Sequence, residues 1–285
     1  MPLVTVVVPA YGRPRFLDEL LDSLLSQPFD DFEVVIVDDA SPESIAVRAH
    51  PRVRLVRRAT NGGPSAARNT GVAAAAGQWV GFADDDDVVT PVRFTSVVPL
   101  MERADIVVCG SDFLDGGQHA YGRRRLDGDL TDTLLDAPTP TLGQVLVRRE
   151  LVQPFDERLR TSEDIEWWIR MAGAGRFASV ADIGYRVRRH PEVRHGIATR
   201  DRLDNRLWTW RRHEAFFRTH RRAAAGHAYR IAAGAYLVGR TGPVVRWSVA
   251  SLRRSPNRPA AALLGRSVLQ ALRRRGRRGP GTGTG

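Results

Sequence analysis

The 285-residue sequence predicts an α/β fold, in which helices flank a mostly parallel sheet and a basic helical extension follows. Two observations predict the sheet: short apolar runs alternate with amphipathic helical patterns, and several of the runs end in polar clusters. Strands separated by helices are typical of parallel sheets that are covered on both faces. A third observation, a last quarter that is rich in arginine and free of acidic residues, predicts the extension.

The elements of the sheet domain follow in order. A nearly continuous β-branched run at 3–8 predicts a first strand that is buried on both faces. Pro14 predicts the start of a helix, because its missing N–H costs nothing in a first turn, and leucines between 17 and 25 then share one stripe. Further strands are expected at 34–37, 53–56, 79–83 and 106–109, and further helices at 65–76 and from Pro91.

The middle of the chain is less regular. Residues 116–140 are polar and predict a long loop, which a strand at 145–147, a helix at 165–172 and a strand at 180–187 follow. After about residue 200 the pattern is helical and rich in arginine, and the last ten residues are Gly, Pro, Thr and Arg. We therefore expect an α/β domain at 1–200, a basic helical extension at 201–275 and a disordered tail at 276–285.

Composition excludes several classes of protein. The 43 basic residues are all arginines, and the absence of lysine excludes a P-loop lysine, a Schiff-base lysine and a pyridoxal-phosphate anchor. The single Cys109 excludes an intramolecular disulfide and a multi-cysteine zinc site. Because no signal-peptide pattern opens the chain and no apolar run reaches 18 residues, we expect a cytoplasmic protein without a membrane-spanning helix.

The net charge of +11 is unevenly distributed. Residues 215–285 hold 15 arginines and no acidic residue, whereas residues 1–214 hold 28 arginines and 32 acidic residues. Leucines near Arg266 and the arginines at 273–275 predict a basic amphipathic helix, which suits the anionic inner face of a cell membrane. The alternative is a solvated helix that packs on the α/β domain. Nucleic acid is a weaker expectation, because no nucleic-acid-binding motif accompanies the arginines.

Polar clusters follow four of the predicted strands, at 9–13, 38–41, 61–63 and 84–87. Ligands of open parallel sheets bind beyond the carboxyl ends of the strands, so the four clusters predict one shared site. The four adjacent aspartates at 84–87 repel one another, and a bound Mg²⁺ or Mn²⁺ would compensate for that repulsion. The alternative for this run is a solvated acidic turn that caps the helix near Pro91.

Three further side chains are candidates for this site. Arg68 would pair with the aspartates or with a diphosphate, and Asp39 would accept hydrogen bonds from a pyrimidine base. The alternative is that Arg68 is an ordinary surface arginine and that Asp39 only forms a turn. Asp164 would be a general base, because a carboxylate beside the apolar wall of Trp167 and Trp168 has a raised pKa. Its alternative is helix capping, and we expect one of the two tryptophans to belong to the core.

Five segments in a fixed order over residues 1–190 match a known family pattern. They are Val-Val-Val-Pro-Ala-Tyr-Gly-Arg at 6–13, Phe-Glu-Val-Val-Ile-Val-Asp-Asp-Ala-Ser at 32–41, Asn-Gly-Gly-Pro-Ser-Ala-Ala-Arg-Asn-Thr-Gly at 61–71, Phe-Ala-Asp-Asp-Asp-Asp at 82–87 before Pro91, and Phe-Asp-Glu-Arg-Leu at 155–159 before Glu163, Asp164 and Arg170. The sequence thereby resembles the family 2 glycosyltransferases, which have the Rossmann-like GT-A fold and a DXD motif. One departure is Gly12, where many members have asparagine.

The resemblance implies a role for each matching residue. The nucleotide-sugar site would contain Pro9, Tyr11, Arg13, Asp39, Arg68, Asp84 and Asp85. The metal ligands would be Asp86 with Asp84 and His190. Asp164 would be the catalytic base, and Glu163 and Trp167 would contact the acceptor or the sugar. His190 comes from a stretch at 185–190 that resembles the family's late Tyr-Arg-x-His segment but has two extra residues, and its alternative is an ordinary surface histidine.

The function implied is metal-dependent, inverting transfer of a sugar from a nucleoside-diphosphate sugar, UDP- or dTDP-linked, to an acceptor hydroxyl. Mn²⁺ or Mg²⁺ would be the cofactor. The reaction would take part in polysaccharide, glycolipid or natural-product glycosylation. One alternative is an inactive sugar-nucleotide-binding protein whose basic tail docks to membrane or nucleic acid; the complete aspartate run and Asp164 favour the enzyme. A nucleotidyltransferase is disfavoured, because the chain lacks the early glycine-rich segment and the lysine of that class.

Overall fold

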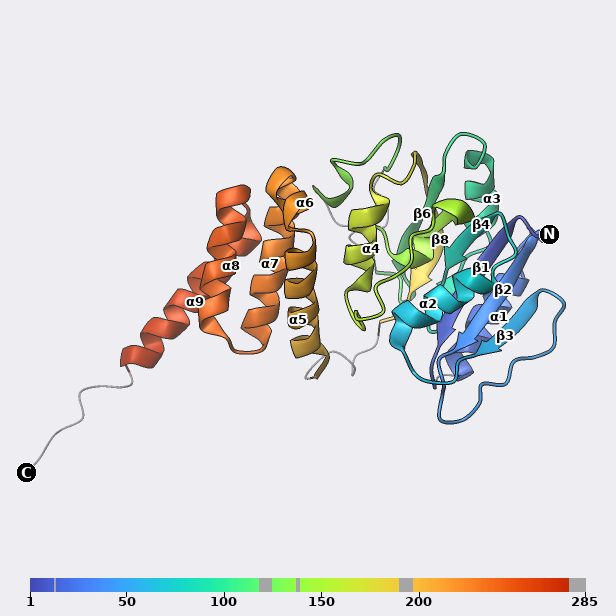
Figure 1. Ribbon diagram of the computed structural model, residues 1–285, viewed down its shortest axis with the longest axis horizontal. Coiled ribbons are helices and arrows are strands. Elements are labelled where there is room, and N and C mark those ends of the chain that lie inside the picture. The colour runs from blue at the N-terminus through green and yellow to red at the C-terminus, as the bar shows by residue number, and fades with distance from the viewer. Residues whose placement is uncertain (13, 118–124, 137–138, 190–196, 277–285) are drawn as a thin grey trace, which may run out of the picture. The chain divides into compact units, whose positions relative to one another are not determined.

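The computed structural model describes residues 1–12, 14–117, 125–136, 139–189 and 197–276. The chain divides into two compact units, Met1–Pro191 and Glu192–Gly285. The first is a mixed α/β unit and the second is helical, so the predicted fold class is confirmed (Figure 1).

One eight-stranded sheet forms the centre of the first unit, in the order β3-β2-β1-β4-β7-β6-β8-β5. The strands are β1 (Val4–Ala10), β2 (Phe32–Asp38), β3 (Val53–Arg57), β4 (Trp79–Phe82), β5 (Val88–Val89), β6 (Ile106–Phe113), β7 (Val145–Arg148) and β8 (Phe177–Val187). The first four strands of this order pair in parallel, as do β6 and β8. Strand β7 is antiparallel to both of its neighbours, and β5 is antiparallel to β8.

Helices cover both faces of this sheet. The leucine stripe of α1 (Pro14–Leu25) and the apolar residues of α3 (Arg93–Val97) share one core with Val6 and Ile36, because alternate strand residues point to the same face. Helix α2 (Gly63–Ala74) packs on the other face against Val35 and Val37. Helix α4 (Glu163–Met171) lies on that second face too, with Trp167 against Phe82.

Some elements differ from the sequence-based expectation. The helix expected from Pro91 begins at Arg93 and is only five residues long, and a 3-10 turn at Val98–Leu100 continues it. In the expected loop 116–140, Gly128 pairs with Phe177 and a 3-10 turn forms at Leu134–Asp136; two more 3-10 turns flank β7, at Leu142–Gln144 and Arg149–Leu151. The tail beyond residue 276 lies outside the described residues.

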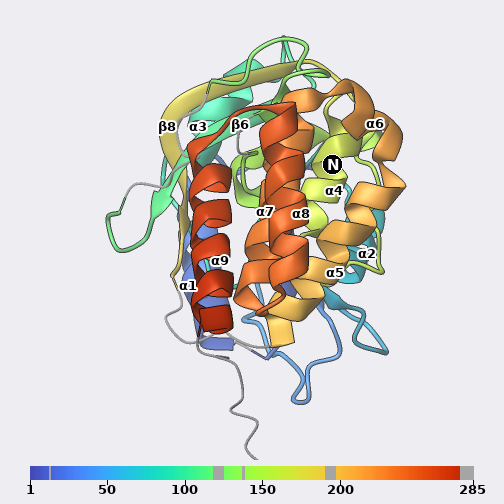
Figure 2. The same ribbon diagram turned by 90° about the vertical axis from the view of Figure 1, so that its left-hand side faces the viewer.

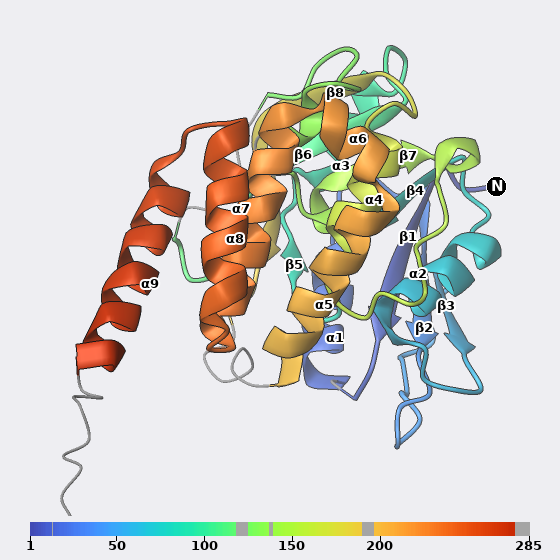
Figure 3. The ribbon, with the colours of Figure 1, turned by 60° about the vertical axis from the view of Figure 1, so that its left-hand side comes forward.

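The helical unit contains α5 (Ile197–Arg212), α6 (Glu214–Thr219), α7 (Arg221–Leu237), α8 (Thr241–Arg254) and α9 (Arg258–Gly276). Helices α7, α8 and α9 lie side by side, and short turns connect them (Figures 2 and 3). Their shared core contains Leu203 of α5, Ile231 of α7, Val244 of α8 and Leu263 of α9. Because Leu263 packs inward, α9 is part of the bundle and has its own buried face.

In the part of the chain that the structure describes, none of the helices is long and apolar enough to span a lipid bilayer.

Candidate active site

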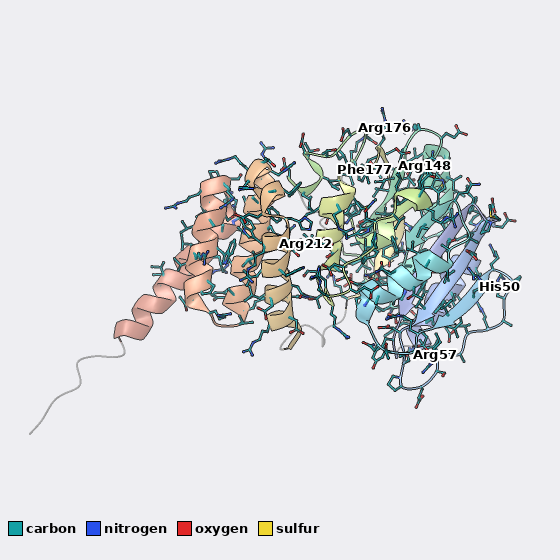
Figure 4. The ribbon with its side chains drawn as sticks, viewed as in Figure 1. His50, Arg57, Arg148, Arg176, Phe177 and Arg212 are labelled. Atoms are coloured by element: carbon teal, nitrogen blue, oxygen red, sulfur yellow. The ribbon has the colours of Figure 1, made fainter. Side chains whose placement is uncertain are left out.

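The polar clusters predicted from the sequence meet at one edge of the sheet. Strands β1, β2 and β3 end level with one another, because Ala10 pairs with Asp38 and Asp38 with Arg57. Figure 4 shows Arg57 at this carboxyl edge, while Arg148 and Phe177 lie at the opposite edge. A surface cavity of about 330 Å³ at that opposite edge is lined by Gln78, Arg148, Arg149 and Glu150. This cavity is therefore separate from the polar clusters at the carboxyl edge.

Asp39 caps the start of α2. Its two carboxylate oxygens accept the backbone N–H groups of Gly62 at 3.0 Å and Gly63 at 2.7 Å, and Arg58 forms an ion pair with it. Gly63 has φ +82°, a conformation that L side chains adopt at a cost, and this turn directs the helix N–H groups at the carboxylate. The carboxylate of Asp39 is therefore bound by its own chain on the side of α2.

Arg68 links the aspartate run to the start of α4. Its Nη2 donates to Asp84 Oδ1 at 2.7 Å and its Nη1 to Glu163 Oε1 at 2.8 Å. Arg68 is 4% exposed, and within the described residues its Nε has no hydrogen-bond partner. Burial alone would lower the pKa of Arg68, but the two carboxylates raise it above its ordinary value, so this arginine stays charged.

The aspartate run is compensated by groups of the protein itself. Tyr185 of β8 donates its hydroxyl proton to Asp87 Oδ2 at 2.7 Å, and the Arg188 N–H donates to Asp87 Oδ1 at 2.7 Å. Burial, followed by the charges of Asp84 and Asp86, raises the pKa of Asp87 to about 8 despite these bonds. Groups of the protein thus bind Asp87, and Arg68 pairs with Asp84 of the same run.

Tyr11 and Asp85 lie together at the end of β1. The Tyr11 N–H donates to Asp85 Oδ2 at 3.2 Å, and the next residue, Gly12, donates its N–H to Ser41 Oγ at 3.1 Å. Tyr11 is 48% exposed although its side chain is large and mostly apolar, whereas Asp85 is buried. Pro9 is a partly exposed residue of β1 on the same edge.

Glu163 and Asp164 form the first turn of α4, after Ser162 with φ +61°. Burial raises the pKa of Glu163, Arg68 lowers it and Asp164 raises it, with a net increase above the ordinary value. Asp164 is partly exposed, as a group that meets a substrate must be. Acidic residues are also stabilised at this position by the helix dipole.

Both tryptophans of α4 belong to the core. Trp167 and Trp168 are 0% exposed. The Trp167 ring stacks on Phe155 with centroids 5.2 Å apart, and its Nε1 donates to the Gln153 carbonyl at 2.8 Å. We expected Trp167 to contact acceptor or sugar and only one of the pair to be core; the closed aromatic cluster leaves Trp167 no surface for that contact.

The structure thus gathers Pro9, Tyr11, Asp39, Arg68, Asp84, Asp85, Asp86, Glu163 and Asp164 on the carboxyl edge or beside it. Arg13 and His190 lie outside the described residues. Among the residues that are described, no three His, Cys, Asp or Glu side chains form a group that could hold a metal ion by themselves.

Sequence reasoning missed the roles of Tyr185, Arg188 and Asp87. In the sequence, the late stretch that starts at Tyr185 is distinctive only for its resemblance to a family segment. Its contacts with the aspartate run join residues about one hundred positions apart, and no local pattern reveals them. The signal that could have suggested them is the run itself, because four adjacent carboxylates require nearby compensating groups.

The fold is that of the GT-A glycosyltransferases. TarS of S. aureus (residues 1–349), solved in complex with UDP-GlcNAc, superposes with a TM-score of 0.63 at 17% identity over 93% of this chain and 84% of that one. A mannosyltransferase from Pyrobaculum calidifontis, solved with GDP-Man and Mn²⁺, superposes with a TM-score of 0.53 at 19% identity over 95% and 81%.

The family follows from the sequence comparison. The model of glycosyl transferase family 2 matches residues 5–155. The uncharacterised glycosyltransferase EpsJ of Bacillus subtilis (strain 168) is 31% identical over 231 residues, which are 73% of this chain and 67% of that protein. The chain belongs to glycosyl transferase family 2, and it is a glycosyltransferase.

Proposed function

We propose that this glycosyltransferase is metal-dependent and inverting, and that it moves a sugar from a UDP- or dTDP-sugar to an acceptor hydroxyl. The bridge formed by Arg68 carries the proposal, because it ties Asp84 of the aspartate run to Glu163 beside Asp164. Two carboxylate groups about 80 positions apart are thereby held next to each other. The complexes of similar proteins with UDP-GlcNAc and with GDP-Man support a nucleotide-sugar donor.

The residues of the aspartate run fit a divalent cation. The Asp84 side chain is 49% exposed and Asp86 is partly exposed, whereas Asp87 is buried and bound by β8. Mg²⁺ and Mn²⁺ commonly take only one or two carboxylates and complete their ligands with substrate phosphates and water. The absence of a three-residue protein group among the described residues is compatible with such a site. When bound, the cation would neutralise charge on the departing nucleoside diphosphate.

The remaining roles belong to side chains of this chain. Tyr11, Asp39 and Asp85 would hold and orient the nucleotide at the end of β1 and β2. Asp164 would take the proton of the acceptor hydroxyl while that oxygen attacks the anomeric carbon, and inversion follows from this single displacement. Arg68 would hold Glu163 beside Asp164, where Glu163 would contact the acceptor or the sugar.

We also propose that the helical unit docks to an anionic membrane surface, where a lipid-linked acceptor would be found. Leu237 is 68% exposed at the end of α7, and Leu269 is 57% exposed in the second half of α9. These two helix ends lie at the same end of the bundle (Figures 2 and 3). Arg240 and Arg266 are exposed near them, and exposed leucines flanked by arginines suit an anionic interface.

The donor is tested by thermal denaturation with a panel of nucleotide sugars. Ligands that bind only the native state raise the melting temperature by an amount set by concentration over affinity. We expect one UDP- or dTDP-sugar to raise it in the presence of Mn²⁺, and a chelator to abolish the increase. Equal increases with and without chelator would contradict the metal site, and no increase with any nucleotide sugar would contradict donor binding.

A further inference from the structure

Four hydrogen bonds join the aspartate run, residues 84–87, to Tyr185 of β8 and to Arg188 directly after it. The Tyr185 hydroxyl accepts the Asp84 N–H at 3.0 Å and donates to Asp87 Oδ2 at 2.7 Å. Arg188 donates its backbone N–H to Asp87 Oδ1 and its Nε–H to the Asp86 carbonyl oxygen, both at 2.7 Å. Strand β8 thus holds three of the four residues of the run: Asp84, Asp86 and Asp87.

Asp87 is the anchor of this arrangement. It is 4% exposed, and each of its carboxylate oxygens is bound by a group of β8 or its end. A buried carboxylate that loses its partners is costly, so the run is most stable in the conformation that directs Asp87 at β8. The backbone positions of Asp84 and Asp86 are fixed by the same conformation, because both are bonded to β8 as well.

Tyr185 is itself held rigidly. It is 1% exposed, and Gly143 passes so close that a Cβ there would lie 2.0 Å from the Tyr185 Cζ atom. The guanidinium of Arg93 also lies over the Tyr185 ring, 5.7 Å from the ring centroid. Strand β5, which directly follows the aspartate run, pairs with β8 so that Val89 is opposite Tyr185. Strand register and close packing therefore place the Tyr185 hydroxyl beside the aspartates at 84–87.

We infer that Tyr185 and Arg188 are positioning residues, which fix the geometry of the aspartate run so that Asp84 and Asp86 can hold a divalent cation and the donor diphosphate. What the run holds rests on the proposed function. The fastening of the run to β8 does not, so the two can be tested separately.

The test compares Tyr185→Phe with Tyr229→Phe, a matched loss of a hydroxyl from a ring that packs against the core of the helical unit. Amide hydrogen exchange of the peptide that covers 83–90 is measured without any ligand. Tyr185→Phe leaves the Asp84 N–H and one Asp87 oxygen without their partner, so we expect exchange there to rise about tenfold, the effect of roughly one lost buried hydrogen bond. Tyr229→Phe should leave that peptide unchanged.

A second variant guards against misfolding. Arg188→Met removes the bond to the Asp86 carbonyl and the ion pair with Glu19 but keeps the backbone N–H that binds Asp87. We expect faster exchange in the same peptide with an unchanged circular dichroism spectrum. Both variants should also weaken Mn²⁺-dependent UDP binding about tenfold, a readout that general destabilisation of a still-folded protein would not change.

The outcomes separate the two claims. Unchanged exchange at 83–90 in both variants would overturn the inference, even in an active enzyme. Faster exchange in the variants, with no Mn²⁺-dependent binding of either UDP or dTDP by the unaltered protein, would support the hydrogen bonding of the run to β8 and contradict the proposed function. Faster exchange with unchanged Mn²⁺-dependent UDP affinity would overturn the positioning role.

Discussion

Arg68 is a buried cation held between two carboxylates that come from different parts of the chain. Asp84 follows β4 and Glu163 begins α4, so the guanidinium joins two elements that are far apart in the sequence. Buried ion pairs contribute little over a well-packed apolar group, but removing Arg68 would be destabilising because the charge of Glu163, whose side chain is 12% exposed, would lose its partner. Arg68 is therefore more important for the arrangement of the carboxylates than for stability in itself.

Replacing Arg68 tests whether its charge compensates the two carboxylates. Arg68→Met leaves Asp84 and Glu163 without their cation, and we expect the free energy of unfolding to fall by about 3 kcal/mol. Urea denaturation measures the loss. Arg125→Met is the control, since Arg125 forms an exposed pair with Asp127 that should contribute less than about 1 kcal/mol. Equal losses in the two variants would mean that Arg68 behaves as an ordinary surface arginine.

Replacing Asp164 tests the proposed base. In Asp164→Asn the acceptor hydroxyl loses its proton acceptor, so we expect kcat to fall by about 10²–10⁴ while the affinity for the nucleotide sugar stays nearly constant. Asp182→Asn, on an exposed part of β8, is the control and should retain full activity. Turnover that is unchanged by Asp164→Asn would refute the assignment.

At the scale of elements, helices α5 and α7 are joined by a buried histidine. His227 of α7 is 2% exposed, and its Nε2 lies 2.9 Å from the Arg206 carbonyl oxygen of α5. Burial is the main reason that its pKa is lowered to about 3, and the nearby Arg230, Arg206 and His213 lower it further. The folded unit therefore contains neutral His227, with Nε2 as the donor to that carbonyl.

This histidine makes the stability of the helical unit depend on pH. An unfolded histidine has a pKa near 6.5, so its contribution to stability is complete above that pH and is lost as the pH falls below it. At pH 5 we expect a loss of about 2 kcal/mol relative to pH 7.5. Urea denaturation at both pH values measures it, and His227→Gln should remove this part of the difference. An identical pH dependence in His227→Gln would contradict the assignment.

At the scale of the whole molecule, the charge is divided between the two units. Residues 192–285 contain 21 arginines against four acidic residues, whereas the overall net charge is only +11. The sheet unit is therefore acidic in balance although we propose that it binds an anionic donor, and Arg68 and a bound cation would supply the local attraction. The positive excess belongs to the helical unit, outside the family 2 match at 5–155.

Vesicle sedimentation tests whether this excess binds membranes. The double variant Leu237→Ser with Leu269→Ser should bind anionic vesicles at least about tenfold more weakly, since each buried leucine contributes about 1.5–3 kcal/mol. Leu55→Ser, an exposed leucine of β3, is the matched control. Point variants are preferable to truncation within α8, because Leu263 of α9 belongs to the core of the bundle. Failure of the unaltered protein to bind anionic vesicles would reject membrane docking.

The sequence predicted most of the sheet domain because its signals are local. The strands β1 to β4, the leucine stripe of α1 and the polar residues at the strand ends all follow from side-chain periodicity. The shortness of α3 was not predicted, and one tryptophan of α4 was expected in the core where the structure buries both. Periodicity reports which face of an element is apolar, but it does not report how much of the rest of the chain covers that face.

The residue types and spacing along the chain determined the family, the parallel sheet and the uneven charge. Only the tertiary structure decided which charges compensate one another. Arg68 with Glu163 and Tyr185 with Asp87 join residues about one hundred positions apart, and such pairs form because folding brings strand ends to one edge and excludes water there. A buried charge must find a partner in space, and its position in the sequence does not say which one.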